Sequence, residues 1–539
     1  DLGTASLKYK SFFAGLVDTE NFKVNGGQGD DGQVLTSTGS GVAWEAASGG
    51  ATDINGLSDA KTFGTSSIML GDATTGTIDA ANYNTGLGVD VFEDLTSGDN
   101  NSAFGFFALG NNTSGGNNTV VGAYAGSLNV DDAENTIVGY AANYPDGGSR
   151  VTAVGSQALN SNTASDNTAV GSLALNATVG GANNTAVGSR AGIGITSGSE
   201  NTFLGYRAGS TTTTATTNVV IGSFALDNGA ANTGGLNTVM GHSAARLITT
   251  GTRNTILGYG AGAAVTTGAG NTLLGGTATG NSITTGSGNI AIGQNALQTL
   301  TASLYPNIAI GENALYSMAT GYQNIAIGYT AGQSATGVGV TLVGDSAGFS
   351  MTSGNGNACF GVAAGYNITT GSNNLMLGNS SGTANQPIGV ITTQSNIIIV
   401  GNADHTASHI QTDWTVASDK RDKTDVTPLD MGLSFINKLE PVTYKWDKRA
   451  KYEEGKTPDG THKESWTDVG FLAQDVEKIE AEFGHKIEDE TNLTTHINDD
   501  KNSYGLTYAK FVPMLVKSVQ ELSTQVDELK QELATLKGE

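Results

Sequence analysis

The chain has 539 residues, a net charge of −24 at pH 7 and one cysteine. One cysteine excludes an intrachain disulfide, and the acidic balance argues against a nucleic-acid partner, because phosphate binding needs stripes of Lys and Arg. No apolar run approaches the about 20 residues of a membrane helix, so we expect no membrane insertion. The chain begins at Asp1, and we expect it to be a fragment or a processed product.

Composition changes abruptly near residue 417. Seventeen of the 26 Lys and Arg residues, but only seven of the 77 glycines, lie in 418–539. The sequence therefore predicts an N-terminal connector or collar at 1–64, Gly/Asn/Thr-rich repeats at 65–401, a neck at 402–417 and a separate domain at 418–539.

The first large part of the chain is a repeat of the form Asn-Thr-x-aliphatic-Gly-x-x-Ala, with a period of about 17 residues. A short fixed period is typical of a solenoid, and 17 residues are enough for a coil with two short strands. The motif glycines are Gly71, Gly88, Gly105, Gly122, Gly139, Gly155, Gly171, Gly188, Gly205, Gly222, Gly241, Gly258, Gly275, Gly293, Gly311, Gly328, Gly344, Gly361 and Gly378, with a looser copy at Gly401.

Each motif position has a structural interpretation. The residue before the Gly, such as Leu204, shares a strand face with the Thr or Ile two residues earlier, and we expect both to point inward. The Gly allows a turn with positive φ. The Asn either forms a ladder from coil to coil or takes a left-handed turn conformation. The Ala three residues after the Gly indicates close backbone approach, within a coil or between chains.

One such coil buries little apolar surface, which favours three chains packed about one axis over a monomeric solenoid. A disordered linker does not need an aliphatic residue at a fixed period. The pattern resembles the β-roll heads of trimeric autotransporter adhesins over roughly 65–401, although the period here is longer. The segment from Gly32 to Trp44 resembles a short motif common in phage tail fibres.

The part after residue 424 reads as an ordinary α+β domain. We expect a helix at Leu429–Glu440, a strand at Val442–Trp446, a polar loop at Lys448–Ser465, a strand leading into a helix at Val469–Val476, and a helix from about Leu506 to Leu536.

The last of these helices carries an unbroken heptad pattern, which we call the heptad seam. Its members are Leu515, Val519, Leu522, Val526, Leu529, Leu533 and Leu536. Such a pattern predicts a parallel coiled coil, here over 506–537, rather than a helix packed on its own domain. The seam leaves the number of chains open, and the trimer follows from the repeats.

Several separated motifs resemble the intramolecular-chaperone domain of phage tailspikes and fibres, which also occurs in some membrane-bound transcription factors. The resemblance covers about 416–537. The motifs are Ser418-Asp419-x-Arg421-x-Lys423, Leu439-x-Pro441-x-x-Tyr444, Gly470-Phe471-x-Ala473-Gln474-Asp475, Tyr508 and the terminal coil. The resemblance implies a domain that trimerises first and aligns three copies of a slow-folding β-stalk. The domain then cuts itself off just before Ser418.

The residues at the junction fit such a cut. Ser418 would attack the carbonyl of Ala417 once Lys423 had taken its proton, since a Ser hydroxyl needs a base to become a nucleophile. A lysine acts as that base only where burial or a neighbouring cation lowers its pKa. Arg421 would assist the Lys or orient the site, and Asp419, Gln474 and Asp475 are supporting residues.

Two alternatives stay open at this junction. Ser418 could instead cap a helix, with Lys423 a solvated charge. Some relatives retain the domain, so the sequence leaves open whether the chain is a single-turnover self-cleaving serine endopeptidase. It predicts no turnover enzyme in the repeats, no cofactor and no metal site.

The sequence as a whole predicts a mainly β protein: a trimeric β-solenoid or β-roll stalk, then an α+β chaperone domain ending in a parallel trimeric coiled coil. We expect a bacteriophage tail fibre, located in the virion and made in the host cytoplasm. Expected partners are two further copies, a host polysaccharide or outer-membrane protein, and other tail proteins. A tailspike depolymerase and a bacterial trimeric surface adhesin are the alternatives. Tyr140, Tyr206, Tyr259 and Tyr329 would bind sugars or pack between chains.

Overall fold

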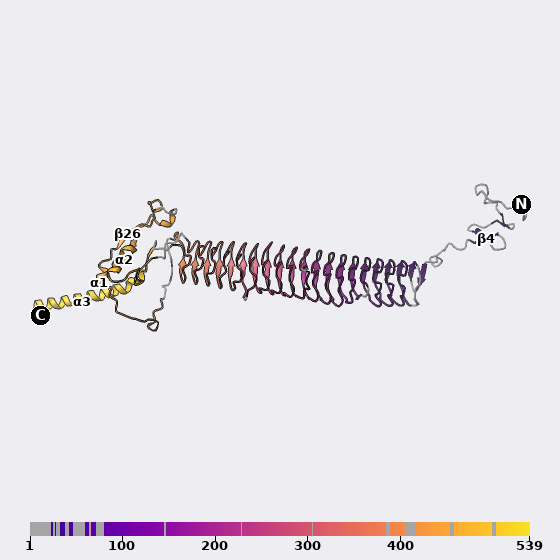
Figure 1. Ribbon diagram of the computed structural model, residues 1–539, viewed down its shortest axis with the longest axis horizontal. Helices are drawn as coiled ribbons and strands as arrows, with labels where there is room; N and C mark the ends of the chain where they lie inside the picture. The colour runs from indigo at the N-terminus through magenta and orange to yellow at the C-terminus, as the bar shows by residue number, and fades with distance from the viewer. Residues whose placement is uncertain are drawn as a thin grey trace. The chain divides into compact units, whose positions relative to one another are not determined.

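Short parallel strands stacked side by side dominate the computed structural model (Figure 1). It describes the strands at 23–24, 27–28, 33–37, 42–46 and 60–63, residues 409 and 411, and the segments 66–71, 80–144, 147–227, 229–303, 305–383, 389–405, 416–452, 457–497 and 503–538. Most of the predicted connector and part of the predicted neck lie outside these residues. The chain divides into two compact units, Asp1–Thr216 and Thr217–Glu539, which we describe in turn.

The first unit begins with antiparallel pairs. β1 (Lys23–Val24) pairs with β2 (Gly27–Gln28), β3 (Gln33–Ser37) with β4 (Val42–Ala46), and β5 (Ala60–Phe63) with β6 (Ser67–Leu70). The described residues of the segment that resembles a tail-fibre motif therefore lie in the antiparallel pair β3–β4.

A parallel ladder of three-residue strands follows from β6. It contains β7 (Thr85–Leu87), β8 (Ser102–Phe104), β9 (Thr119–Val121), β10 (Thr136–Val138), β11 (Thr152–Val154), β12 (Thr168–Val170), β13 (Thr185–Val187) and β14 (Thr202–Leu204). Equal motif positions face each other, so Thr185 pairs with Thr202 and Val187 with Leu204. The solenoid prediction is confirmed, but each coil contributes one strand to this ladder instead of the expected two.

The second unit continues the same architecture. Its ladder contains β15 (Val219–Ile221), β16 (Thr238–Met240), β17 (Thr255–Leu257), β18 (Thr272–Leu274), β19 (Ile290–Ile292), β20 (Ile308–Ile310), β21 (Ile325–Ile327), β22 (Thr341–Val343), β23 (Ala358–Phe360), β24 (Leu375–Leu377) and β25 (Ile398–Val400). Neighbouring strands again pair in parallel with equal motif positions opposite each other.

The middle residue of each strand points inward, and the expected inward pair points outward. Ala186 and Phe203 are fully buried, whereas Phe104 and Leu204, which precede motif glycines, are 38% and 45% exposed. The expectation that the pre-glycine residue and the Thr face the interior is therefore wrong. The reason is that the motif Asn, two residues before the strand's middle residue, is itself buried. Side chains alternate along a strand, so the Asn and the middle residue occupy one face and the other two positions the opposite face.

The buried Asn side chains form a ladder along the coils. Asn184 Oδ1 accepts hydrogen bonds from the backbone N–H and from Nδ2 of Asn201, both at 3.0 Å. Its own Nδ2 donates to the Gly198 carbonyl at 2.9 Å. The second unit repeats this arrangement between Asn254 and Asn271. The expected Asn ladder is confirmed, and it satisfies polar backbone groups that the narrow coil buries.

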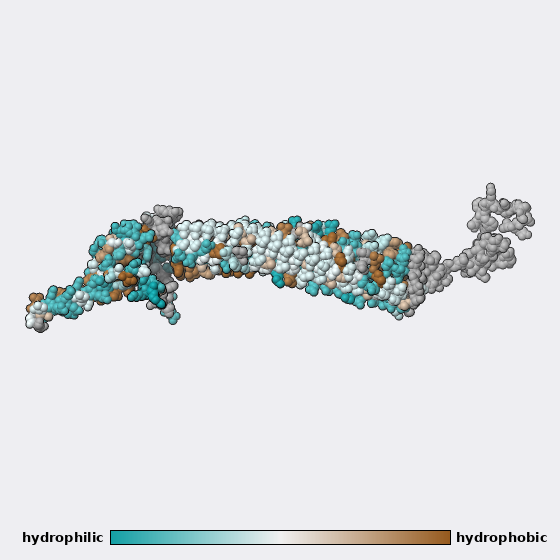
Figure 2. Space-filling model, turned by 60° about the horizontal axis from the view of Figure 1, so that its bottom comes forward, coloured by the Kyte–Doolittle hydropathy of each residue, from teal (hydrophilic) through white to brown (hydrophobic). Residues whose placement is uncertain are grey.

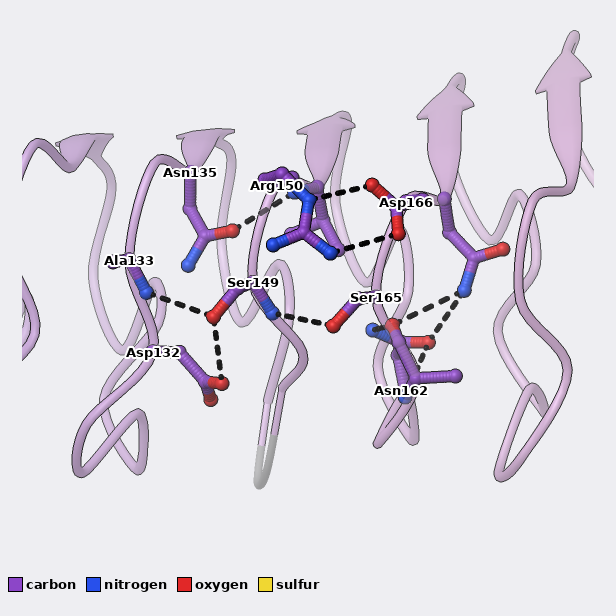
Figure 3. A network of polar contacts seen from close by, with 11 residues as sticks. Asp132, Ala133, Asn135, Ser149, Arg150, Asn162, Ser165 and Asp166 are labelled. Atoms are coloured by element: carbon purple, nitrogen blue, oxygen red, sulfur yellow. Dashed lines mark hydrogen bonds and ion pairs between the residues drawn. The ribbon is translucent and has the colours of Figure 1, made fainter.

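The ladder tolerates a coil that lacks the Asn, as Figure 3 shows. Val151 takes the Asn position there, and its backbone N–H still donates to Asn135 Oδ1 at 2.9 Å. Next to it, Arg150 forms a two-pronged ion pair with Asp166 of the following coil, at 2.7 and 2.9 Å. Contacts between equivalent positions of successive coils thus extend to the surface.

Two small motif residues allow the coils to stack closely. Gly188 has a φ of +137°, and a Cβ atom there would lie 2.5 Å from the carbonyl oxygen of Gly205 in the next coil. Only glycine suits such a position. The Ala three residues after the Gly is fully buried in the coil, as Ala191 and Ala296 show. The small residue therefore serves packing within the chain.

The second unit ends in two short helices, one long helix and antiparallel strand pairs. These are α1 (Leu433–Ile436), β26 (Val442–Tyr444) paired with β27 (Asp468–Gly470), α2 (Ala473–Glu482), β28 (Thr495–Ile497) paired with β29 (Tyr504–Leu506), and α3 (Phe511–Lys537). Three short 3₁₀ turns join them: η3 (Lys420–Asp422), η4 (Arg449–Lys451) and η5 (Tyr508–Lys510). Met431, Phe435, Val476, Phe511 and Met514 form the core.

Two helices are shorter than the sequence predicts. α1 covers four residues of the expected helix at Leu429–Glu440. α3 begins at Phe511 because Tyr504–Leu506 is used in the β28–β29 pair. Pro513 falls in its first turn, where the missing N–H costs no helical hydrogen bond. Among the described residues, no helix is long and apolar enough to cross a membrane.

Replacing Asn184 with Ala tests the ladder. The substitution leaves the Asn201 N–H and the Gly198 carbonyl buried without their partner, at about 1–3 kcal/mol for each group. We expect hydrogen exchange at the Asn201 amide to accelerate, while Ser189→Ala, an exposed change in the same coil, leaves that rate unaltered. Unchanged protection of Asn201 in the Asn184 variant would show that the ladder contributes nothing to stacking.

Candidate functional site

A short turn brings the predicted nucleophile and base together. Asp419 caps η3, because its Oδ1 accepts the Arg421 backbone N–H at 2.9 Å. The turn reverses the chain between Ser418 and Lys423, and Lys423 Nζ donates to Ser418 Oγ at 2.5 Å. The five-residue spacing thus places an amine directly on the hydroxyl, and Asp419, not Ser418, provides the cap.

Arg421 lies on Asp419 and is not directed at the lysine. Its Nη2 lies 2.6 Å from Asp419 Oδ2, and its Nε also donates to that carboxylate. The side-chain hydrogen bond from Arg421 lowers the pKa of Asp419 and raises that of Arg421. The pair holds the turn that carries Ser418 and Lys423 on its two ends.

The Ser–Lys pair is open to water in the single chain. Ala417, Ser418 and Lys423 are all exposed. A Ser–Lys dyad works by keeping the lysine deprotonated, which requires removal of water or a nearby cation. In the single chain, Ser418 and Lys423 are in contact and remain exposed to water.

The other two predicted supporting residues lie on α2. Gln474 is exposed in the first turn, and Asp475 forms an ion pair with Lys478 at 2.8 Å. Among the described residues, no hydrogen bond joins either of them to Ser418 or Lys423.

The neighbouring motif residues have a structural role. Tyr508 Oη accepts the Phe471 backbone N–H at 3.1 Å. A Cβ atom at Gly470 would lie 2.4 Å from that oxygen, so this close approach needs glycine. The ring of Phe471 stacks on Phe511 at the start of α3, with ring centres 5.5 Å apart. The motif therefore connects the β26–β27 pair to the terminal helix.

Two carboxylates that the sequence did not single out hold the domain together. Glu480 is fully buried and accepts hydrogen bonds from the backbone N–H and hydroxyl of Thr494, at 2.6 and 2.7 Å, and from those of Thr495. Glu521 on α3 accepts the Leu433 N–H at 2.7 Å and so caps α1. That bond, with the Lys517 side chain, lowers the pKa of Glu521. Glu480 lies four residues after Val476, so the two side chains share one face of α2. That spacing is the sequence feature that could have indicated that Glu480 is buried.

The heptad seam lies on a different face of α3 from the one that packs on the domain. Phe511, Met514 and Ser518 are the buried residues of the helix. The seam members are all exposed, with Val519 at 65% and Leu529 at 63%. Among the described residues, nothing in the chain covers this apolar row, which repeats every seven residues.

Comparison with known families identifies the class of this region. Residues 418–485 match the family described as chaperone of endosialidase. The match starts at Ser418 and includes the Ser–Lys turn, the β26–β27 pair and α2. Residues 418–485 are therefore similar to this chaperone family. Comparisons with curated proteins and with solved structures found no match.

Glu480→Ala tests whether the buried carboxylate of Glu480 stabilises this domain. Without the acceptor, the donors of Thr494 and Thr495 are buried unpaired, and we expect a loss of about 1–3 kcal/mol per donor. Urea unfolding followed by tryptophan fluorescence measures it, since Trp446 and Trp466 lie in the domain. The exposed Glu488→Ala is the matched control. Equal midpoints for the two variants would contradict the role of Glu480.

Proposed function

We propose that the chain is the subunit of a homotrimeric bacteriophage tail fibre whose C-terminal domain acts as an intramolecular chaperone. The carrying observation is the chaperone-of-endosialidase match at 418–485, which comes after a long repeat solenoid in the sequence. The exposed heptad seam of α3 supports the oligomer, and the repeats supply the fibre shaft. The chain belongs to the virion and attaches it to the host.

The shaft needs such a chaperone for a physical reason. Every coil presents nearly the same motif, so neighbouring chains displaced by one coil would make similar contacts. Wrong registers are therefore close in energy to the right one, and long repetitive β-structures assemble slowly. A coiled coil at one end brings three chains together at equal positions and selects one register before the shafts pack.

Trimer assembly also completes the cleavage site. Packing of further chains around the exposed turn would exclude water from Ser418 and Lys423. Lys423 takes the Ser418 hydroxyl proton, and Oγ attacks the Ala417 carbonyl carbon. The Ala417–Ser418 peptide bond breaks with protonation of the Ser418 nitrogen, leaving an ester that water hydrolyses. The products are a fibre ending in the Ala417 carboxylate and a free domain beginning at Ser418.

Receptor contact is assigned to the aromatic side chains on the coils. Phe106, Phe107, Tyr124, Tyr140 and Tyr144 form one group of ring contacts, with Phe106 and Tyr124 ring centres 5.1 Å apart. Phe106, Tyr124 and Tyr140 are exposed, and Phe107 and Tyr144 are half-buried. Flat aromatic rings with a polar edge suit sugar rings of a host polysaccharide. Release of reducing sugar from host capsule or lipopolysaccharide would instead favour a tailspike depolymerase, and secretion genes beside its gene would favour an adhesin.

Ser418→Ala and Lys423→Ala test the cleavage. Each removes one half of the dyad, so we expect a full-length chain from both variants, while the wild type releases a fragment that begins at Ser418. Intact mass and N-terminal sequencing of freshly expressed protein measure this.

Lys420→Ala is the matched control, because Lys420 is an exposed lysine of the same turn. It should leave cleavage unchanged. A wild-type chain that stays intact for days under native conditions would overturn the protease assignment and leave a retained chaperone.

Leu522→Asp with Leu529→Asp tests the seam. Two carboxylates per helix would be buried between chains, where desolvation is costly. We expect monomeric or insoluble protein without cleavage, measured by sedimentation and gel analysis. Thr524→Asp with Gln531→Asp places the same charges on the outer side of the helix and should still give cleaved trimers. Loss of assembly in both double variants would show that the seam is not the determinant.

A further inference from the structure

In each unit the strand ladder has an outer face, formed by the first and third residues of each three-residue strand, that is exposed or partly exposed, and this face is more apolar in the second unit. In β19, β20 and β21 both outer residues are isoleucine: Ile290 and Ile292, Ile308 and Ile310, Ile325 and Ile327. In-register pairing sets Ile308 beside Ile325 and Ile310 beside Ile327. The side chains thus form two continuous rows, and Ile327 is 38% exposed.

This face carries no charge in the described strands from β7 to β25, although the whole chain has a net charge of −24. A sheet face that meets water usually has polar residues at alternate positions. Here those positions hold mostly Thr and aliphatic residues, with Ser102, Phe104, Met240 and Phe360 as the others. Figure 2 shows apolar patches interrupting the pale surface of the coils. A long exposed apolar surface marks an interaction site.

We propose that the outer face of the ladder is buried against copies of the same chain, which run parallel and in register with it. The occupant must offer an apolar, uncharged surface that repeats with the same period over many coils. The chain itself provides such a surface. The uncharged strip is also where two strongly acidic chains approach with the least repulsion. Parallel copies joined through the heptad seam of α3 present the same coils to each other. The inference rests on the proposed homo-oligomer and names the face through which the solenoids of its chains contact each other.

Cysteine accessibility tests the assignment in the full chain. The natural Cys359 is fully buried, and burial raises its pKa to about 12, so it stays unreactive in the native protein. Ile327→Cys places a thiol on the outer face. Thr320→Cys places one on an exposed bend outside the strands and is the matched control. Val400→Cys, in the last strand, repeats the test should the first variant fail to fold.

Each variant is treated with a bulky maleimide under native conditions, and its mass is measured by sedimentation. We expect a trimer in which the thiol at 327 or 400 reacts slower by an order of magnitude or more than the thiol at 320. A trimer with equal rates overturns the face assignment and leaves the proposed oligomer intact. A monomer with equal rates overturns both. A monomer with a protected thiol means that another part of the chain covers the face, and it also overturns the inference.

Discussion

The buried asparagine ladder is the constraint on which the rest of the structure depends. Asn184 and its equivalents sit inside the coil, bonded to the next Asn and to a backbone carbonyl. Their burial decides which strand face is interior, because side chains alternate. The middle residue then packs inside with the Ala of the turn, and the residue before each Gly must face outward. The same ladder holds successive coils in register and close together. At this spacing the motif position must be glycine, because a Cβ atom there would collide with the backbone of the next coil.

Because the Asn ladder fixes the interior face, a row of apolar residues faces outward along the coils. This row is the reason why the proposed trimer needs a C-terminal domain that aligns its chains. Leu204 and Ile327 are exposed in the single chain, and in the proposed homotrimer they would face a second solenoid with the same period. In the proposed homotrimer, such a surface would not fix the register between chains, because every coil resembles the next. The exposed heptad seam of α3 would then set that register from the C-terminal part of the chain. In the proposed homotrimer, the region that matches the chaperone family, 418–485, would align chains whose interface is repetitive and uncharged.

Local patterns predicted much of this architecture, and long-range contacts account for the differences. The period of the glycines predicted the coils, and the motif after Gly470 predicted a strand that leads into a helix. The spacing of Ser418 and Lys423 anticipated their contact. The outward position of Leu204 was missed because polar Asn is rarely buried in a narrow core. Glu480 was missed because its partners, Thr494 and Thr495, come from another segment. α3 begins later than predicted because Tyr504–Leu506 pairs with β28.

The most direct test of the account is the mass of residues 1–417 expressed without the C-terminal domain, compared by sedimentation with the mass of the shaft released from the full chain. The account predicts a trimeric shaft from the full chain and misregistered, aggregated material from 1–417 alone, because nothing then aligns the copies. A soluble, heat-resistant trimer from 1–417 alone would contradict it. The ladder face would then select its own register, and the domain would serve only as a cap or a receptor contact.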